Sequence, residues 1–415
     1  MIRGILTAPA QGAFVNDDHC AIKDGSKRKN FRYLGMPRTP GFTQIRMSAK
    51  GLSVGILLSD GYVAWGDMMS VQYAGAGGRE KLFDPAEATR LLKGELGGRL
   101  HDLDFRDLRK EMAALFQRLS SGKRVPAAVQ YGISQAVLGA YAHVKALTIA
   151  EVLAKAYRIE LIARPVPIYA QSGDDRNSNV QKMILKRVDI LPHGLINSPS
   201  AFGTKGRAFR EFAAWVAAQV REENDDQYRP VLHFDVYGNP GLAFGGDPKL
   251  IAAFISSVAD QVAPYKLNIE SPADYGGVEA QAEGFARIRK ELDALGCEAK
   301  IVVDEWCDTI DDIRTFAQAR AADIVQIKMP DVGSVTTSFE AVRLCKRLGV
   351  GAYLGGSCTE TDLSARVSVH VAVASQADMQ LAKPGMGVDE ALSIVGNEQA
   401  RLLATLQSQR SSTVA

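Results

Sequence analysis

The sequence predicts an α/β protein: a modified (β/α)8 barrel of the TIM type, preceded by a smaller α+β capping domain. From about residue 165, short apolar segments alternate with longer segments whose apolar residues recur every three or four positions, as in strand–helix units around a parallel sheet. Eight such units occupy roughly 250 residues, the length of a closed barrel. The earlier residues lack this alternation, so we predict a capping domain over 1–160 and a barrel domain with a C-terminal helix over 161–415.

The capping domain is predicted from β-rich segments that precede helices. Residues 42–67 contain short β-rich runs separated by "AKG" and "SDG", which we interpret as hairpin turns of an antiparallel meander. Amphipathic helical stretches follow, at 85–97, 104–119 and 125–157.

The barrel strands are predicted to be short and apolar, as expected for strands buried on both faces. They lie at 165–171, 187–193, 230–235, 265–270, 299–305, 323–328, 350–356 and 379–383. The structural alternative is a doubly wound open sheet, which normally carries a glycine-rich phosphate loop after its first strand. The nearest candidate, "GAGGRE" at 75–80, lacks the G-x-G-x-x-G spacing and lies outside any βα unit, so we favour the barrel.

The composition indicates a soluble globular protein with a sizeable core. Of 415 residues, 46% are hydrophobic and 23% charged, and the net charge is +2, which gives no electrostatic reason to expect nucleic acid or a membrane as partner. No signal peptide and no apolar run of membrane-spanning length is recognised. The cysteines form no C-x-x-C pair, so a reduced, cytoplasmic protein fits best; they are Cys20, Cys297, Cys307, Cys345 and Cys358.

Polar or ionisable residues end nearly every predicted barrel strand. The active sites of such barrels form at the C-terminal ends of the strands, so these side chains should meet around one mouth. The alternative, that each side chain merely pairs with a nearby loop, is weaker for so many equivalent positions. The residues are Gln171, His193, Asp235, Glu270, Asp304, Lys328, Ser357 and Cys358.

Three of these residues are carboxylates on consecutive strands. Asp235, Glu270 and Asp304 are separated by 35 and 34 residues, one βα unit each. Carboxylates gathered on one side of a barrel mouth would repel one another without a counter-charge, and they form an oxygen-rich site that suits Mg²⁺. Separate salt bridges to surface lysines are the alternative, which the apolar runs before each carboxylate disfavour.

Lys328 and His193 are predicted to act as proton-transferring groups. Lys328 follows the sixth strand beside Asp304, and burial near a dication should lower its pKa towards neutrality and allow it to act as a base. A Schiff base is the other role open to a barrel lysine. His193 ends the second strand, opposite the sixth in a ring of eight, so it could reach the other face of one substrate; a histidine satisfied by its own loop is the alternative.

These residues, in this order, resemble the enolase superfamily and, within it, the methylaspartate ammonia-lyase family. The resemblance covers most of the chain, and the matching strings are specific only in combination. They are "VQYAGAGGR" (71–79), "YAQSGDDR" (169–176), "ILPHGLIN" (190–197), "HFDVYG" (233–238), "VVDEWC" (302–307), "VQIKMPD" (325–331), "GGSCTET" (355–361) and "LAKPGMGVDE" (381–390).

The resemblance implies an enolase-like fold and the reversible, Mg²⁺-dependent elimination of ammonia from L-threo-3-methylaspartate to mesaconate, assisted by K⁺, in a homodimer. It implies that Asp235, Glu270 and Asp304 hold Mg²⁺, and that Lys328 removes the C3 proton to form an ene-diolate, with His193 acting on the opposite face, as base for the other C3 epimer. It also implies a set of substrate contacts: Gln72, Gln171, His193, Gln326, Ser357 and Cys358 for the polar groups, and Leu381 and Met386 for the methyl group.

The chain departs from the family pattern at three positions near these residues. Ser271 stands where glycine is usual, Met329 where threonine is usual, and Ser357 where threonine is usual. None removes a charge or a metal ligand, but each bears on substrate preference.

Other functions fit less well. The aspartase/fumarase type of ammonia-lyase uses a G-S-S-x-M-P loop in a helical bundle, and this chain has neither that loop nor that pattern. Another superfamily activity, such as a racemase, epimerase or cycloisomerase, usually places K-x-K or K-x-H pairs on the second strand, where this chain has Pro192 and His193. A non-catalytic barrel would be expected to have lost ligands or the base.

Overall fold

A closed barrel of parallel strands forms the larger part of the molecule. The structure is a computed structural model, and it describes residues 1–414. The strands close in the order β10-β11-β12-β13-β6-β7-β8-β9, which confirms the predicted barrel. Each predicted strand segment contains one strand, shorter than predicted: β6 (Ile168–Tyr169), β7 (Ile190–His193), β8 (Val231–Asp235), β9 (Leu267–Glu270), β10 (Lys300–Val303), β11 (Ile324–Ile327), β12 (Gly351–Leu354) and β13 (Met379–Leu381).

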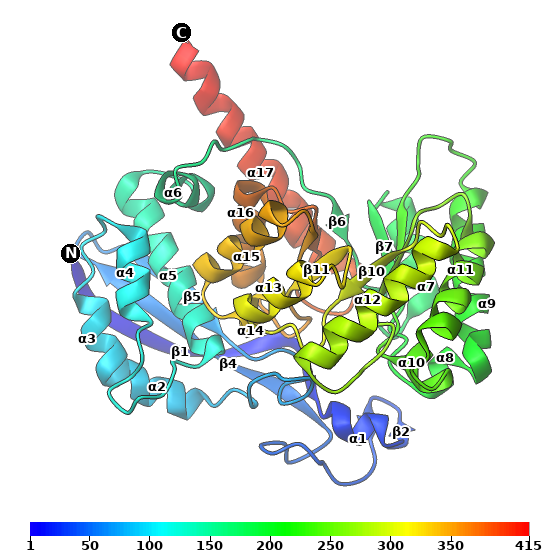
Figure 1. Cartoon of the computed structure of the whole chain (residues 1–415). Coiled ribbons are helices and arrows are strands. Elements are labelled where there is room, and N and C mark those ends of the chain that lie inside the picture. The colour runs from blue at the N-terminus through cyan, green and yellow to red at the C-terminus, as the bar shows by residue number, and fades with distance from the viewer. Residues whose placement is uncertain (415) are drawn as a thin grey trace.

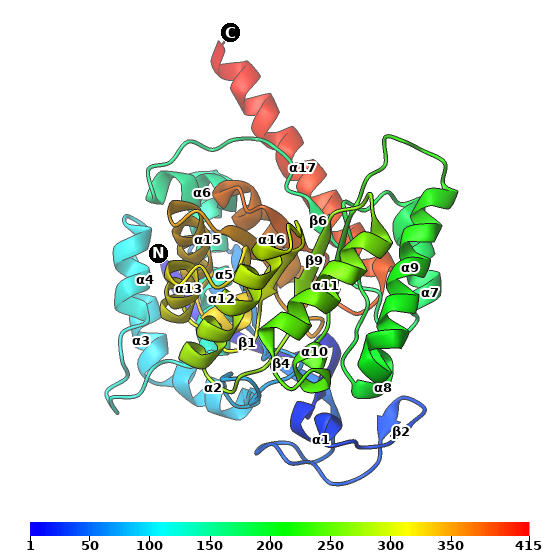
Figure 2. The same cartoon turned by 45° about the vertical axis from the view of Figure 1, so that its right-hand side comes forward.

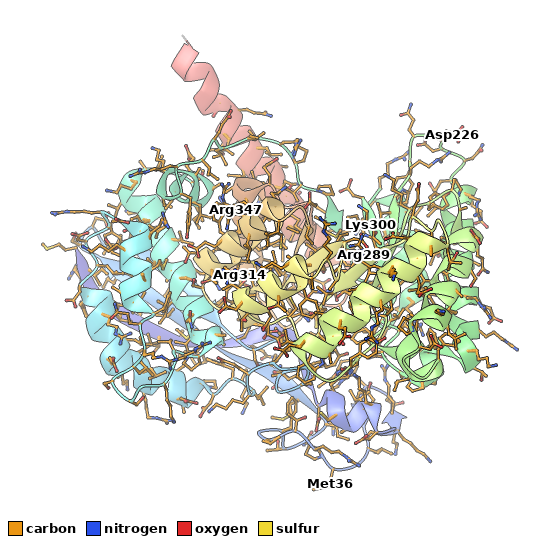
Figure 3. The ribbon with its side chains drawn as sticks, viewed as in Figure 1. Met36, Asp226, Arg289, Lys300, Arg314 and Arg347 are labelled. Carbon is orange, nitrogen blue, oxygen red and sulfur yellow. The ribbon has the colours of Figure 1, made fainter. Side chains whose placement is uncertain are left out.

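Helices surround the barrel on its outside, as Figures 1 and 2 show. Charged side chains such as Arg289, Arg314 and Arg347 lie on this outer layer (Figure 3). The helices are α7 (Arg176–Leu185), α8 (Pro199–Phe202), α9 (Arg207–Glu222), α10 (Asn239–Ala243), α11 (Pro248–Val262), α12 (Val278–Ala294), α13 (Ile310–Gln318), α14 (Met329–Val332), α15 (Val335–Arg347), α16 (Asp362–Ser375) and α17 (Val388–Val414), with a short 3₁₀ turn at Thr204–Gly206. The end of α17 projects away from the body of the molecule in both views.

The barrel interior is filled by side chains. Tyr169, Val302 and Tyr353 are buried there with Ile190 and Met379, so the barrel is a packed core and the site lies at its mouth. A larger apolar cluster joins the outer faces of the strands to the helices. The strands therefore read as nearly continuous apolar runs because both of their faces are covered.

The N-terminal part of the chain contains a three-stranded antiparallel sheet formed by β1 (Ile2–Asp17), β4 (Arg46–Leu58) and β5 (Val63–Met68), in the order β1-β4-β5. The predicted "SDG" turn joins β4 to β5. The predicted "AKG" turn is wrong, because β4 runs straight through it. A Cβ on Gly51 would lie 2.9 Å from the carbonyl oxygen of Met68 and 3.2 Å from the Cβ of Ala10. The glycine is needed for close approach of the three strands, and not for a turn.

Strand β1 (Ile2–Asp17) was not predicted. Its sequence contains Gly4, Pro9 and Gly12, which normally argue against a strand. Proline is tolerated here because β1 lies at the edge of the sheet. Gly12 is required where β1 meets the barrel, since a Cβ there would lie 2.0 Å from the carbonyl oxygen of Thr359.

The predicted N-terminal helices are present but more divided than expected: α2 (Pro85–Lys93), α3 (Glu95–His101), α4 (Leu108–Leu115), α5 (Ala127–Lys145) and α6 (Ile149–Ala156). The single stretch predicted at 125–157 breaks at Ala146, whose φ is +52°, and α6 restarts at a capping box formed by Thr148 and Glu151. Within residues 1–414, no single helix is long and apolar enough to cross a membrane, and α5 with α6 meets those criteria only as a pair bent by 91°.

A segment between β1 and β4 extends from the sheet towards the barrel mouth. It contains α1 (His19–Lys23), β2 (Arg28–Lys29) and β3 (Arg32–Tyr33), and Met36 lies at its outer edge (Figure 3). Arg28 forms a bidentate pair with Asp174 at 2.9 and 2.8 Å, so this segment is tied to the loop that follows β6.

Candidate active site

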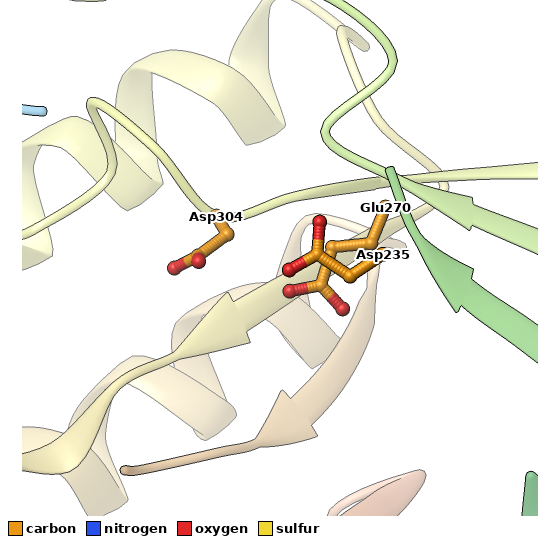
Figure 4. A group of neighbouring side chains, drawn as sticks. All are labelled: Asp235, Glu270 and Asp304. Atoms are coloured by element: carbon orange, nitrogen blue, oxygen red, sulfur yellow. The ribbon is translucent and has the colours of Figure 1, made fainter. Parts of the chain in front are cut away.

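Three buried carboxylates converge at the mouth of the barrel. Asp235 and Glu270 end β8 and β9, and Asp304 directly follows β10. One oxygen from each lies within 4.8 Å of the others, and Figure 4 shows the three side chains with the carboxylates of Asp235 and Glu270 adjacent. The predicted neighbourhood is therefore present, because the carboxyl ends of adjacent parallel strands meet at one edge.

The electrostatics of the three carboxylates favour a bound cation. Burial raises the pKa of Asp235 and of Glu270 well above the ordinary value, and the neighbouring carboxylates raise both further. Burial also acts to raise the pKa of Asp304, but Lys328 and Arg79 hold it below its usual value. A divalent cation would relieve the repulsion, and an all-oxygen donor set suits Mg²⁺ better than softer metals.

Glu270 is oriented by one side chain from the adjacent strand β8 and one from β11, two strands away. His233 Nε2 lies 2.8 Å from one carboxylate oxygen, and the amide nitrogen of Gln326 donates to the other at 2.5 Å. The His233 ring is itself stacked on Tyr169, with centroids 4.2 Å apart. Such outer contacts fix the direction of a metal ligand. Gln326 thus supports Glu270 in addition to lining the cavity, and its oxygen has no hydrogen-bond partner among the described residues.

Lys328 follows β11 and points at Asp304. Its ammonium donates to Asp304 Oδ2 at 2.8 Å. The lowered pKa is predicted beside a bound dication and stays a prediction, while the side chains alone act in the opposite direction. Burial and Arg79 both act to lower the pKa of Lys328, but Asp304 and the nearby carboxylates Asp331 and Glu305 outweigh them and raise it.

His193 ends β7, which lies four positions from β11 around the ring, so the two residues face one cavity from opposite sides. Its Nδ1 accepts the amide of Leu195 at 3.3 Å, and its Nε2 lies 3.6 Å from Asp235 Oδ2. Burial and the charge of Lys328 lower the pKa of His193 to about 4, although Asp304 opposes them. The imidazole is therefore neutral at pH 7, the form that can accept a proton.

The N-terminal part of the chain supplies one wall of the cavity. The backbone amide of Gln72 donates to Ser357 Oγ at 3.0 Å, and the Cys358 thiol donates to Gln72 Oε1 at 3.2 Å. The Gln72 amide nitrogen donates to Asp17 at 2.9 Å. Burial, with a smaller effect of Asp17, raises the pKa of Cys358 to about 12, so the thiol is a hydrogen-bond donor and not a nucleophile.

The cavity enclosed by these residues has a volume of about 40 Å³. Most of the residues predicted for the site line it: Gln72, Gln171, His193, Asp235, Asp304, Gln326, Lys328, Ser357, Cys358 and Leu381. Glu270 is fully buried behind this lining. Met386 lies outside the lining and packs against the cluster of Tyr73, Leu195 and Tyr237, of which the two tyrosines line the cavity.

The structure shows the conformation or the contacts of the three residues that depart from the family pattern. Ser271 adopts a φ of +52°, in the left-handed region that favours glycine, and its hydroxyl donates to Glu305. Met329 is fully buried, with its sulfur 3.8 Å from the Lys383 ammonium. Ser357 Oγ accepts the amides of Gln72 and Thr359.

Sequence reasoning missed two residues that support the carboxylates. His233 lies two positions before Asp235 on β8, so the alternation of side chains along a strand could have placed it in the barrel interior. Arg79, whose side chain is 1% exposed, donates to Asp304 Oδ1 at 3.1 Å. It stands in the glycine-rich segment 75–80, and no spacing rule connects it with residue 304.

Comparison with known proteins matches nearly the whole chain. Residues 1–158 match the family described as methylaspartate ammonia-lyase N-terminus, and residues 160–408 match methylaspartate ammonia-lyase C-terminus. The methylaspartate ammonia-lyase 1 of Carboxydothermus hydrogenoformans is 43% identical over 411 residues, which cover 99% of this chain and 98% of the relative.

Solved structures agree with the sequence matches. The Citrobacter amalonaticus methylaspartate ammonia-lyase containing (2S,3S)-3-methylaspartic acid has a TM-score of 0.95 and 40% identity, covering 98% of this chain and 99% of its own. The β-methylaspartase of Clostridium tetanomorphum, solved as a Mg complex, has a TM-score of 0.91 and 40% identity, with coverage of 98% and 99%. A muconate lactonizing enzyme from Pseudomonas fluorescens, at 15% identity and a TM-score of 0.64 over 95% and 88% of the two chains, shows the shared fold alone. Near-complete coverage at these identities means that the chain belongs to the methylaspartate ammonia-lyase family and is a carbon–nitrogen lyase.

Proposed function

We propose that this protein is a Mg²⁺-dependent ammonia-lyase that reversibly converts L-threo-3-methylaspartate into mesaconate and ammonia. The observation that carries the proposal is the cavity itself, in which Lys328 and His193 stand on opposite sides beside three buried carboxylates. The relative that contains methylaspartic acid supports the choice of substrate.

Asp235, Glu270 and Asp304 would hold the metal. When bound, Mg²⁺ supplies positive charge that stabilises the negative charge gained by the substrate carboxylate as C3 loses its proton. Bound Mg²⁺ would offset the charge of Asp304, which raises the pKa of Lys328, and Lys328 in its neutral form would then accept the C3 proton of the threo substrate. The electron pair of the C3–H bond then forms the C2–C3 double bond. The C2–N bond breaks, and its own electron pair leaves with the nitrogen as ammonia.

His193 is proposed to accept the C3 proton from the opposite face, as the base for the other C3 epimer. Its low pKa keeps the imidazole neutral. Because Nδ1 accepts the Leu195 amide, the neutral ring carries its own proton on Nε2. Proton abstraction by Nε2 therefore requires that this proton moves to Nδ1 when substrate binds. The two bases therefore divide the two epimers between them, because each reaches only one face of the substrate.

The remaining predicted residues are proposed as substrate contacts. Hydrogen-bonding groups line the cavity at Gln72, Gln171, Gln326, Ser357 and Cys358, and these suit the two carboxylates and the amino group of an amino-dicarboxylate. Leu381 supplies an apolar wall for the methyl group. Met386 is proposed to contribute through the Tyr73 and Tyr237 wall against which it packs.

Four further features are part of the proposal. They are activation by K⁺, a homodimeric state, a cytoplasmic location, and the division into domains 1–160 and 161–415. The location is supported by five free cysteines, three of them buried, as expected in a reducing compartment. Size measurement in solution tests the dimer, and replacement of K⁺ by a larger organic cation tests the activation.

A racemase, epimerase or cycloisomerase acting on a carboxylate is the alternative that the same cavity permits. The deciding experiment incubates the pure protein with L-threo-3-methylaspartate, Mg²⁺ and K⁺, and follows the far-ultraviolet absorbance of the new conjugated double bond. We expect absorbance to rise together with free ammonia. No rise, alongside turnover of an unrelated carboxylic acid, would favour the alternative.

A further inference from the structure

The glycine-rich segment 75–80, which forms no phosphate loop, brings Arg79 from the N-terminal part of the chain into the barrel mouth. The guanidinium donates from Nη2 to Asp304 Oδ1 at 3.1 Å and from Nε to Asp331 Oδ2 at 3.1 Å. Asp308 Oδ1 lies 3.6 Å from Nε. One arginine thus spans three carboxylates, of which one is a proposed metal ligand.

Two glycines allow this approach. Gly77 and Gly78 have φ values of +63° and +92°, which other residues rarely adopt. A Cβ on Gly78 would lie 2.7 Å from Asp308 Oδ2, and the carbonyl of Gly77 accepts the backbone amide of Trp306 at 3.1 Å. The turn is therefore packed against the loop that follows β10, and this packing sets the position of Arg79.

Asp304 needs external support to a degree that the other two carboxylates do not. Asp235 and Glu270 are the last residues of their strands, whereas Asp304 follows the end of β10. Glu270 is also fixed by His233 and Gln326 from within the barrel. Asp304 is fixed by Lys328 on one oxygen and by Arg79 on the other.

Arg79 is well suited to hold a carboxylate in a fixed direction. Its side chain is 1% exposed, and although burial opposes the charge, Asp304, Asp308 and Asp331 raise the pKa of Arg79 well above its ordinary value. The planar guanidinium presents several N–H donors in fixed directions, so it can bind two carboxylates at once. A lysine carries the same charge but lacks this geometry.

We propose that Arg79 is a positioning residue that orients Asp304 for Mg²⁺, so that tight metal binding by the barrel depends on a side chain from the N-terminal part of the chain. The inference rests on the metal centre of the proposed function. It adds to that function a contact by which the N-terminal part of the chain orients a metal ligand of the barrel.

The test is the Mg²⁺ affinity of the whole protein without substrate, measured by titration calorimetry. We expect Arg79→Lys to weaken Mg²⁺ binding by about 10-fold or more, the loss typical when a supporting contact to a metal ligand is removed. Glu80→Gln is the matched control, because Glu80 accepts the backbone amide of Ala127 from the same segment and does not contact Asp304. It should bind Mg²⁺ as the wild type does.

Thermal unfolding separates positioning from a general structural role. A purely structural Arg79 would lower the melting temperature without metal and leave the rise caused by Mg²⁺ unchanged in size. If Arg79 positions Asp304, the Arg79→Lys variant should lose much of the rise in melting temperature that subsaturating Mg²⁺ causes in the wild type. Wild-type Mg²⁺ affinity in Arg79→Lys would overturn the inference and leave the proposed function standing. Absence of Mg²⁺ binding by the wild type would overturn both.

A second variant keeps the inference testable if Arg79→Lys does not fold. Asp331→Asn leaves Arg79 in place but weakens the contact that holds Nε. We expect Asp331→Asn to weaken Mg²⁺ binding, by less than the loss of Arg79 itself, because Nη2 still donates to Asp304. Wild-type Mg²⁺ affinity in a folded Asp331→Asn variant would contradict a role through Arg79.

Discussion

Lys328 contacts the proposed metal ligand Asp304 and lines the cavity, so its removal should mainly slow the chemical step. We expect Lys328→Ala to lower kcat for the threo substrate by about 10²–10⁴-fold, the usual contribution of a general base. The absorbance assay measures it. The comparison is made at saturating Mg²⁺, because Lys328 also holds one oxygen of Asp304 and its removal changes Mg²⁺ affinity as well. Turnover within a few-fold of the wild type would contradict the assignment.

His193 faces the same cavity from the other side. We expect His193→Ala to reduce turnover of the other C3 epimer far more than turnover of the threo substrate, because only that epimer presents its proton to His193. Paired kcat measurements on the two epimers give the ratio. Equal losses for both epimers would rule out one base for each face.

At the scale of residues, the sequence predicted side chains whose position follows from a strand end and missed those that depend on distant loops. Asp235, Glu270 and Asp304 could be placed together because equivalent strand ends meet at one mouth. Arg79 could not, since its contact with Asp304 joins positions 225 residues apart through a glycine turn. The pKa of Lys328 also depends on neighbours that the sequence did not place beside it, because Asp331 and Glu305 raise it together with Asp304.

At the scale of elements, a buried ion pair joins the end of β13 to the loop that carries Ser357 and Cys358. Lys383 is fully buried and donates to Glu360 at 2.9 Å, and the same Glu360 oxygen accepts the amide of Ser357. The other Glu360 oxygen accepts the hydroxyl of Tyr131 on α5 at 2.7 Å. The pair therefore connects barrel, loop and N-terminal helix.

Lys383→Met should destabilise the protein strongly, because it leaves the buried Glu360 carboxylate without its counter-charge. We expect a loss of about 3–5 kcal/mol in the free energy of unfolding, measured by denaturant titration. Lys81→Met, which breaks an exposed pair with Glu87, should change it by no more than about 1 kcal/mol. Equal effects of the two variants would contradict the structural role of the buried pair.

Whether an element was predicted correctly depended on whether its signal was local. The barrel strands are short, largely apolar runs that alternate with helical segments, so each was found from this local pattern. The "AKG" segment failed because Gly51 serves a close contact with β1 and β5, which is invisible locally. The break between α5 and α6 had a local signal, the Thr148–Glu151 capping box, which outweighs the continuous amphipathic pattern around it.

At the scale of the whole molecule, the N-terminal part and the barrel form one cavity together. Gln72 and Arg79 come from the former, and the remaining predicted lining comes from the latter. The fold class could be predicted because it depends on the repetition of strand and helix. How the two parts pack together could not, because it rests on close approaches such as that of Gly12 to Thr359.

Metal removal should affect the whole molecule reversibly. Bound Mg²⁺ stabilises the folded state, by about 2.7 kcal/mol when its concentration is 100 times its dissociation constant. We expect EDTA to stop turnover and lower the melting temperature, and Mg²⁺ in excess to restore both. Undiminished turnover in EDTA after dialysis would contradict a metal-dependent reaction.

The most direct measurement is the position of the metal in a crystal grown with Mn²⁺, which scatters anomalously and replaces Mg²⁺ at oxygen-rich sites. The account predicts one anomalous peak within coordination distance of an oxygen from Asp235, Glu270 and Asp304, with the Lys328 nitrogen facing the same cavity. A peak elsewhere, or three carboxylates that pair with separate cationic side chains around an empty centre, would contradict it.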